Sequence, residues 1–267
     1  MSVLVATDLD RTMIYSRKAL GHGERVERPV TVEVHDGADS SFMTAAAARA
    51  FGALADSTVL VPVTTRVPEQ YLRVGLPGRP PQFAVAANGG VLYVDGVADR
   101  GWAKSVATML AGTVPLSEVW AHTAQVCSPQ WTKKVRNADG LFCYAILYPH
   151  LVPAGFVDDM TGWAAERGWR TSLQGRKLYW VPELLTKSAA VAEIARRIEP
   201  ELLVAAGDSL LDVDLLLAAD RAIHPRHGEL FEQGWSSPKV TCTRASGAAA
   251  GEEILTWFGA QLPSAPT

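Results

Sequence analysis

The chain has few cysteines and no marked excess of either charge. Its 267 residues include three cysteines, which lie far apart and form no CxxC pair, and the formal net charge is -3. This cysteine content argues against a disulfide framework or a zinc site and suits a reducing compartment. No run of five like charges occurs, so nothing indicates a nucleic-acid-binding face.

Long apolar segments are also missing. The longest candidate, AAAARAFGALADSTVLVPV, is interrupted by Arg49 and Asp56 and does not predict a membrane span. The N-terminus has no basic region followed by a long apolar core, so no secretory signal is predicted. We therefore expect a soluble, cytoplasmic protein with no membrane partner. Hydrophobic residues make up 48% of the chain, enough for the cores of one large or two modest domains.

Short runs rich in Val, Ile and Leu alternate with Ala-rich helical patterns toward both ends of the chain. Such alternation is typical of βαβ units and predicts an α/β protein with a parallel sheet. Thr44 is expected to cap the first of these helices. The expected strands are residues 3–6, 58–63, 202–206 and 239–243, and the expected helices are residues 44–54, 188–198, 212–219 and 252–258.

The middle of the chain is richer in Trp and Tyr. Its segment FAVAANGGVLYVDG contains Asn88-Gly89, a strong turn signal that predicts a β-hairpin. Two further strands, at residues 141–148 and 177–181, and a helix between them at residues 154–168 indicate an α+β module.

The alternating strand and helix patterns at the two ends and the different pattern in the middle predict two domains. A Rossmann-like three-layer core with a parallel sheet would be formed by residues 1–83 together with residues 186–267. An α+β cap, residues 84–185, would be inserted between these two parts of the core.

Polar side chains stand where the expected strands end or the helices begin. Because ligands of open parallel sheets bind beyond the carboxyl ends of the strands, we expect these side chains to meet. Several carboxylates at one place repel each other unless a hard cation lies among them, and oxygen ligands favour Mg²⁺, completed by water and a substrate phosphate. The side chains are Asp8, Asp10, Thr64, Thr65, Arg66, Lys187, Asp208, Ser209 and Asp212.

These residues stand in four motifs that resemble those of the haloacid dehalogenase (HAD) superfamily. DLDRT resembles the first motif, DxDxT, while VPVTTR, LLTKSAAV and GDSLLD match the second, third and fourth in order and spacing. An isolated DxD at a strand end is more often a turn than a catalyst, but the ordered set is specific. The segment Asn88-Gly89-Gly90 is similar to the cap entry of Cof-type phosphatases. Sucrose-phosphate and mannosyl-3-phosphoglycerate phosphatases have the same large inserted cap.

The resemblance implies a role for each catalytic position. Asp8 would be the nucleophile that forms an aspartyl-phosphate, and Asp10 would be the general acid and base. Thr64 would donate a hydrogen bond to the transferring phosphoryl group, and Lys187 would neutralise its charge.

The resemblance also implies a Mg²⁺ site and a small phosphorylated substrate. Asp8, the backbone carbonyl of Asp10 and Asp208 would bind the ion, while Asp212 would bind it through water or hold Lys187. Candidate substrate contacts are Thr65, Arg66, Arg136 and Arg176. For the two cap residues, Arg136 and Arg176, a solvated surface role is the simpler explanation.

Three positions depart from the family pattern without removing a residue of direct role. Arg11 and Thr65 replace glycines that are common in the family, and Leu211 replaces a common Asn, which could weaken the orientation of the metal. The span between the first two motifs is also long. Its extra segment, roughly Tyr15 to Met43, is predicted to form a flap hairpin beside the active site.

The sequence thus predicts a Mg²⁺-dependent phosphatase of a small phosphorylated metabolite, with a sugar phosphate or phosphorylated polyol fitting the cap type best. A monomer or homodimer is expected, with no nucleic-acid partner. Two alternatives stay open. A phosphomutase of the same superfamily would return an isomerised ester instead of free phosphate, and a binding or regulatory module would hold Mg²⁺ and phosphate without turnover.

Overall fold

The computed structural model describes residues 2–20 and 28–262. The chain divides into two compact units, Met1–Asp99 with Lys187–Thr267 and Arg100–Thr186, which we call the core unit and the inserted unit. The first division falls after Asp99, later than the boundary expected after residue 83.

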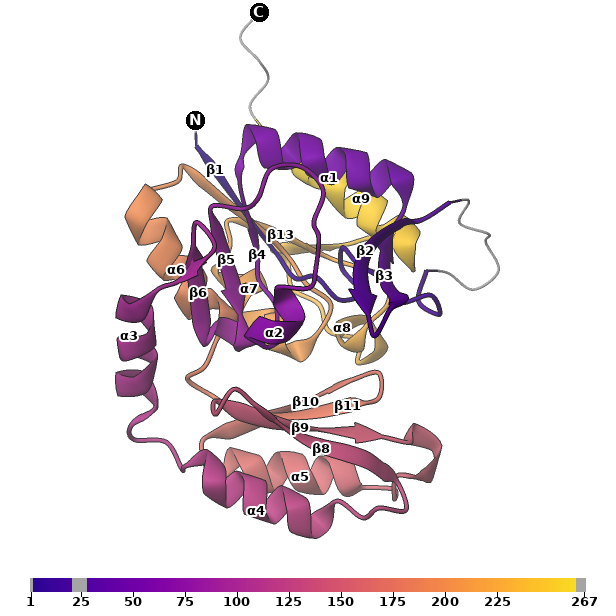
Figure 1. The fold of residues 1–267 in the computed structure, drawn as a ribbon, viewed down its shortest axis with the longest axis vertical. Helices are drawn as coiled ribbons and strands as arrows, with labels where there is room; N and C mark the ends of the chain where they lie inside the picture. The colour runs from indigo at the N-terminus through magenta and orange to yellow at the C-terminus, as the bar shows by residue number, and fades with distance from the viewer. Residues whose placement is uncertain (1, 21–27, 263–267) are drawn as a thin grey trace, which may run out of the picture. The chain divides into compact units, whose positions relative to one another are not determined.

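The core unit is built on a five-stranded parallel sheet in the order β14-β13-β12-β1-β4 (Figure 1). The α/β class and parallel sheet predicted from the sequence are confirmed. The strand at residues 221–224 was not anticipated, because its sequence RAIH has only two apolar residues between Arg221 and His224. The strands are β1 (Val3–Thr7), β4 (Val59–Pro62), β12 (Leu202–Ala206), β13 (Arg221–His224) and β14 (Val240–Cys242).

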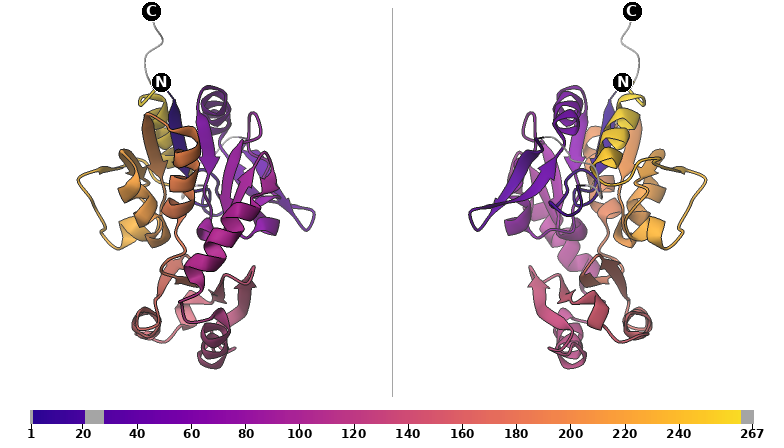
Figure 2. Two further views of the ribbon diagram at one scale, coloured as in Figure 1. Left: turned by 90° about the vertical axis from the view of Figure 1, so that its left-hand side faces the viewer. Right: turned by 90° about the vertical axis from the view of Figure 1, so that its right-hand side faces the viewer.

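Helices cover both faces of this sheet. Val3 and Val5 of β1 share a hydrophobic cluster with Phe51 of α1 and Ile254 of α9. Since alternate residues of a strand point to opposite faces, Leu4 faces the other side, where α6 packs against α7 (Figures 1 and 2). The helices are α1 (Ala45–Ser57), α2 (Pro68–Tyr71), α6 (Lys187–Ile198), α7 (Val213–Ala218), α8 (Glu229–Glu232) and α9 (Ala248–Gly259), with 3-10 turns η1 (Ala87–Gly89) and η3 (Leu210–Asp212).

The hairpin predicted from Asn88-Gly89 is present but belongs to the core unit. Strand β5 (Phe83–Ala86) pairs antiparallel with β6 (Val91–Val94), which pairs with β7 (Val97–Ala98). The N–H of Thr64 donates to the carbonyl of Val85 at 2.8 Å, which ties the hairpin to the end of β4. This pairing explains why the first unit continues to Asp99.

A second hairpin lies within the extension predicted to form a flap. Strands β2 (Val30–His35) and β3 (Ala38–Met43) pair antiparallel around Asp36-Gly37, whose φ angles of 52° and 75° suit a tight hairpin turn. Residues 21–27 of the extension lie outside the described residues.

The inserted unit is an antiparallel sheet in the order β10-β11-β9-β8, with α4 and α5 packed on it (Figure 1). Trp169 and Trp180 are fully buried in its core. The strands and helix predicted in this region are present. The elements are α3 (Arg100–Leu110), α4 (Leu116–Val126), β8 (Thr132–Ala138), β9 (Phe142–Leu147), η2 (Pro149–Leu151), α5 (Phe156–Ala165), β10 (Trp169–Gln174) and β11 (Lys177–Pro182).

Within the part of the chain that the structure describes, every helix is too short or too polar to cross a membrane.

Candidate active site

The register of the parallel sheet brings the motif residues to one edge. Thr7 at the end of β1 pairs with Ala206 of β12 on one side and with Pro62 of β4 on the other. The residues that follow these strands therefore emerge side by side, as strand ends of a parallel sheet do. Asp8 continues directly from β1, and its N–H donates to the carbonyl of Ala206 at 2.9 Å.

Lys187 joins two of the predicted carboxylates. Its Nζ lies 2.6 Å from Oδ1 of Asp8 and 2.5 Å from Oδ1 of Asp212, and all three residues are buried. Burial lowers the pKa of the Lys187 ammonium, but the neighbouring Asp212 and Asp8 outweigh that effect and hold it above its ordinary value. Lys187 is therefore a fixed positive charge beside Asp8.

Asp212 is held on both of its carboxylate oxygens. Oδ1 accepts from Lys187, while Oδ2 accepts from the N–H groups of Asp208 and Ser209 and from the Ser209 hydroxyl at 2.7 Å. A carboxylate with this many donors is a rigid anchor. Its position fits the predicted alternative in which Asp212 holds Lys187.

Asp8, Asp208 and Asp212 each offer an oxygen, and these atoms lie within 4.8 Å of one another. Three buried carboxylates face the single ammonium of Lys187, with Arg11 Nε 3.7 Å from Asp208 at the margin. Burial, together with Asp212 and Asp10, raises the pKa of Asp8 to about 7 against the opposing effect of Lys187. The pKa of Asp208 is raised well above its ordinary value by burial and by Asp8 and Asp212. Excess buried negative charge on hard oxygen donors fits a divalent cation such as Mg²⁺.

Two glycines make room for this cluster. A Cβ at Gly207 would come within 2.4 Å of the Asp212 side chain, and a Cβ at Gly228 would come within 2.5 Å of Asp208 Oδ2. Gly228 also has a φ of +89°, which side-chain-bearing residues rarely adopt. Gly207 lies in the GDSLLD motif, whereas no local pattern marked Gly228.

Thr64 lies two residues after β4 and is buried. Its hydroxyl oxygen accepts the N–H of Arg66 at 3.1 Å, which orients the side chain. Thr65 is also buried, and its hydroxyl lies 3.5 Å from Oδ1 of Asn88. Asn88 is fully buried in a left-handed conformation, so the hairpin turn supports the second motif from within the core unit.

Two residues that depart from the family pattern, Arg11 and Leu211, make contacts within the core unit. Arg11 adopts a left-handed φ of 63°, where glycine would be unstrained, and His227 Nε2 lies 2.7 Å from its carbonyl oxygen. The N–H of Gly247 donates to His227 Nδ1, so His227 carries its proton on Nε2 and donates to Arg11. Leu211 is fully buried in the core unit, so it contributes apolar packing where a polar residue was expected.

Arg66 was predicted to contact the substrate, but its guanidinium is engaged within the protein. Nε and Nη2 bind the two carboxylate oxygens of Asp10 at 2.6 and 2.9 Å, and Nη1 lies 2.9 Å from Glu33 on β2. Sequence patterns missed Glu33, because it alternates with three valines as though on an exposed face. The predicted metal contact of the Asp10 carbonyl stays a prediction.

The remaining candidates belong to the inserted unit, whereas the residues of the carboxylate–lysine cluster belong to the core unit. Arg136 is on β8, and Arg176 is in the turn between β10 and β11. Their predicted substrate contacts stay predictions.

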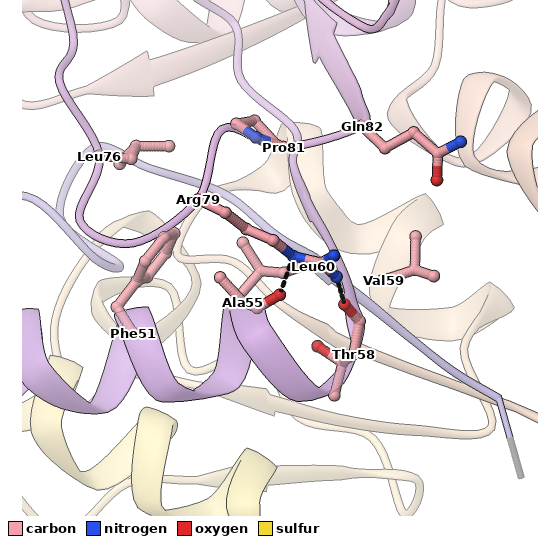
Figure 3. A pocket seen from close by; sticks show the side chains of 9 residues that line it. All are labelled: Phe51, Ala55, Thr58, Val59, Leu60, Leu76, Arg79, Pro81 and Gln82. Carbon is pink, nitrogen blue, oxygen red and sulfur yellow. Dashed lines mark hydrogen bonds between the residues drawn. The ribbon is translucent and has the colours of Figure 1, made fainter.

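A small pocket in the core unit does not belong to the candidate site. It lies at the start of β4, where Arg79 donates to the carbonyls of Ala55 and Thr58 at 2.6 and 3.0 Å (Figure 3). Its volume of about 20 Å³ is enough for one water molecule. The carboxylates stand at the opposite ends of the strands, so this pocket holds no part of the chemistry.

The Rossmann-like core with an inserted α/β unit resembles the fold of haloacid dehalogenase-like hydrolases. Solved structures bear this out. The sucrose-phosphatase from Synechocystis sp. PCC6803, in complex with sucrose and phosphate, matches with a TM-score of 0.67 and 16% identity, over 97% of this chain and 99% of that one. A haloacid dehalogenase-like hydrolase from B. subtilis matches with a TM-score of 0.58 and 12% identity, over 97% and 99%.

The C-terminal domain of trehalose-6-phosphate phosphatase from C. albicans matches with a TM-score of 0.56 and 12% identity, over 98% of this chain and 93% of that one. No protein-family model and no curated protein matches the chain. Identities this low show a shared fold, so the fold resemblance inferred from the four motifs is confirmed, whereas a shared fold does not establish an activity.

Proposed function

We propose that this protein is a Mg²⁺-dependent phosphatase that hydrolyses a small phosphorylated metabolite through an aspartyl-phosphate intermediate. The observation that carries the proposal is the buried Asp8 carboxylate, 2.6 Å from Lys187 and within reach of two further buried carboxylates. A structural ion pair needs one carboxylate for one ammonium. The surplus of negative charge in a buried site instead favours a bound cation, which together with Lys187 would balance the charge of a phosphoryl group.

The chain's own residues supply the steps of the reaction. An oxygen of Asp8 attacks phosphorus, the bond from phosphorus to the leaving oxygen breaks, and Asp10 gives that oxygen a proton. Asp10 then takes a proton from the water that attacks the aspartyl-phosphate, which releases phosphate and restores Asp8. Lys187 and Thr64 would hold the phosphoryl oxygens through both displacements.

The cluster would also hold the metal ion. Asp8, Asp208 and the Asp10 carbonyl would bind Mg²⁺, while Asp212 would act through water or through Lys187. The bound ion would supply positive charge that neutralises the phosphoryl oxygens.

A sugar phosphate is the substrate class we propose. Its support is fold-level analogy, because two of the matched structures are a sucrose-phosphatase and a trehalose-6-phosphate phosphatase domain. Arg136 and Arg176 are proposed to contribute to its recognition. We propose that the protein acts in the cytoplasm as a monomer or homodimer.

The test is release of free phosphate from a panel of phosphate esters, with and without Mg²⁺. We expect Mg²⁺-dependent release by the wild type and a loss of about 10³-fold or more in kcat for Asp8→Asn. Asp95→Asn, at an exposed position of the core unit, is the matched control and should retain activity. An isomerised ester without free phosphate would favour the phosphomutase. Mg²⁺ binding without turnover of any ester would favour the binding module.

A further inference from the structure

Arg66 is a more buried residue than the carboxylate it holds. Its side chain is 12% exposed, whereas that of Asp10 is 48% exposed. Nε and Nη2 of Arg66 bind Oδ2 and Oδ1 of Asp10 in a two-point contact. Such a bidentate pair fixes the plane of the carboxylate as well as its distance, so the orientation of the guanidinium sets the orientation of Asp10.

Glu33 fixes the opposite end of that guanidinium. Its side chain is 3% exposed, and Oε2 lies 2.9 Å from Arg66 Nη1. The same oxygen accepts the hydroxyl of Ser41 at 2.6 Å, and Oε1 lies 3.4 Å from Arg73 Nη2. Burial alone would raise the pKa of Glu33, but the Ser41 hydroxyl, Arg66 and Arg73 together lower it. Glu33 is therefore a carboxylate held in place by three donors.

The hairpin that carries Glu33 is hydrogen-bonded to the segment that follows Asp10 and to the segment that follows Arg66. Tyr15 and Phe42 exchange backbone hydrogen bonds of 2.9 and 2.8 Å, which tie β3 to the segment that follows Asp10. The N–H of Gly75 donates to the carbonyl of Val32 at 2.7 Å, which ties β2 to the segment that follows Arg66. Glu33 thus acts from a backbone whose position is fixed relative to both partners.

We propose that Glu33 is a positioning residue for Asp10 and acts through Arg66. This inference rests on the proposed function, since it matters only if Asp10 transfers a proton. Without Glu33, the guanidinium can rotate away from the plane that presents Asp10 to the leaving oxygen. Proton transfer depends on hydrogen-bond reach within a few tenths of an ångström, so a small rotation costs rate.

The dependence of the rate on the leaving group distinguishes a positioning role of Glu33 from a purely structural one. The ratio kcat/KM covers the steps up to departure of the alcohol, in which the phosphorus–oxygen bond breaks and Asp10 protonates the leaving oxygen. An alkyl phosphate such as glycerol phosphate needs that proton, because an alkoxide is a poor leaving group. p-Nitrophenyl phosphate releases a stable phenolate and hardly needs it.

The experiment compares kcat/KM of Glu33→Gln and wild type on these two esters. We expect a loss of about 10-fold or more on glycerol phosphate and less than about 3-fold on p-nitrophenyl phosphate. Glu69→Gln is the matched control, because Glu69 pairs with Arg73 but is 89% exposed, and it should change neither value. Ser41→Ala, which removes a hydrogen bond to Glu33 and to Arg66 without changing charge, should show a smaller loss of the same selectivity.

Thermal unfolding shows whether Glu33→Gln is folded. If it is not, the comparison of the two esters is made with Ser41→Ala instead. Equal losses on both esters, or no loss on either, would overturn the positioning role while leaving the phosphatase standing. Absence of phosphate release by the wild type from every ester would instead overturn the proposed function, and this inference with it.

Discussion

At the scale of single residues, the candidate site brings several like charges together in a buried environment. Oxygen atoms of Asp8, Asp208 and Asp212 lie within 4.8 Å of one another, so removing the ammonium that lies among them would leave their negative charges less compensated. Lys187 shows the point, since it is fully buried and pairs with two of the three carboxylates. Breaking a buried pair of this kind typically costs about 3–5 kcal/mol.

The raised pKa of Asp8 predicts a pH-dependent response to Mg²⁺. A carboxyl whose pKa rises from 3.8 in the unfolded chain to about 7 in the fold contributes stability that is present below about pH 4 and is lost as pH rises through about 7. A bound cation replaces the protons that the cluster would otherwise hold. We therefore expect the increase in Tm caused by Mg²⁺ to be larger at about pH 8 than at about pH 5, as measured by thermal unfolding.

Asp208→Asn is the control for this prediction. It removes one charge and one metal ligand from the cluster, so the gain in Tm from Mg²⁺ should become small at both pH values. An increase in Tm for the wild type that is the same at both pH values would contradict the prediction.

Individual motif residues were predictable because each stands shortly after a strand or at the start of a helix. Asp8, Lys187, Asp208 and Asp212 are brought together as the sequence predicted, since the register of parallel strands determines which ends are neighbours. The partner of Arg66 was not predictable. Its contact with Glu33 depends on how a hairpin from the extension folds back, and no local pattern encodes that.

At the scale of elements, Gly228 and the short helix α8 that follows it shape the candidate metal site. The N–H of Leu230 donates to the carbonyl of Asp208 at 3.0 Å, which ties α8 to the fourth motif. Gly228 approaches the Asp208 side chain so closely that no Cβ fits. This close approach makes the short helix part of the site, although its four residues would be marginal alone.

Gly228→Ala is expected to destabilise the protein and to weaken Mg²⁺ binding. The new Cβ would meet Asp208 Oδ2 and the Asp208 carbonyl at 2.5 and 2.7 Å, so the loop or the carboxylate must move. Gly140→Ala is the matched control, because Gly140 has a similar φ of +74° with nothing within 4 Å of its Cβ position. It should cost about 1 kcal/mol of stability from backbone strain alone.

Denaturant unfolding gives the stability of both variants, and titration calorimetry gives their affinity for Mg²⁺. A loss of Mg²⁺ affinity in Gly228→Ala but not in Gly140→Ala is the expected result. Equal behaviour of the two variants would show that the close approach at Asp208 has no effect on the metal site.

The elements with long, regular patterns were also the ones that the sequence predicted best. Helix α1 begins after Thr44 as expected, and the Thr44 hydroxyl accepts the N–H of Ala47 at 3.0 Å. The hairpin around Asn88 was predicted correctly, but its membership was not, because the bond from Thr64 to Val85 that ties it to the sheet is a tertiary contact. Local patterns therefore predicted elements better than boundaries.

At the scale of the whole molecule, the chain is two units with separate cores. The inserted unit has its own sheet and helices, and its buried side chains include Phe142, Trp169, Leu178 and Trp180. A compact unit with its own hydrophobic core can in principle fold alone. The indole N–H of Trp169 also donates to the carbonyl of Val114 at 2.9 Å, a contact that closes within the unit.

We therefore expect a fragment of residues 100–186 to fold on its own. Far-ultraviolet circular dichroism should show mixed α/β structure, and tryptophan fluorescence should shift to longer wavelength in one cooperative transition as denaturant exposes Trp169 and Trp180. Trp180→Ala should abolish that transition or move it to much lower denaturant, since removing a fully buried Trp costs about 3–5 kcal/mol. Trp120→Ala is the control at a partly exposed position and should leave the transition nearly in place. A fragment without cooperative unfolding would show instead that the inserted unit needs the core unit to fold.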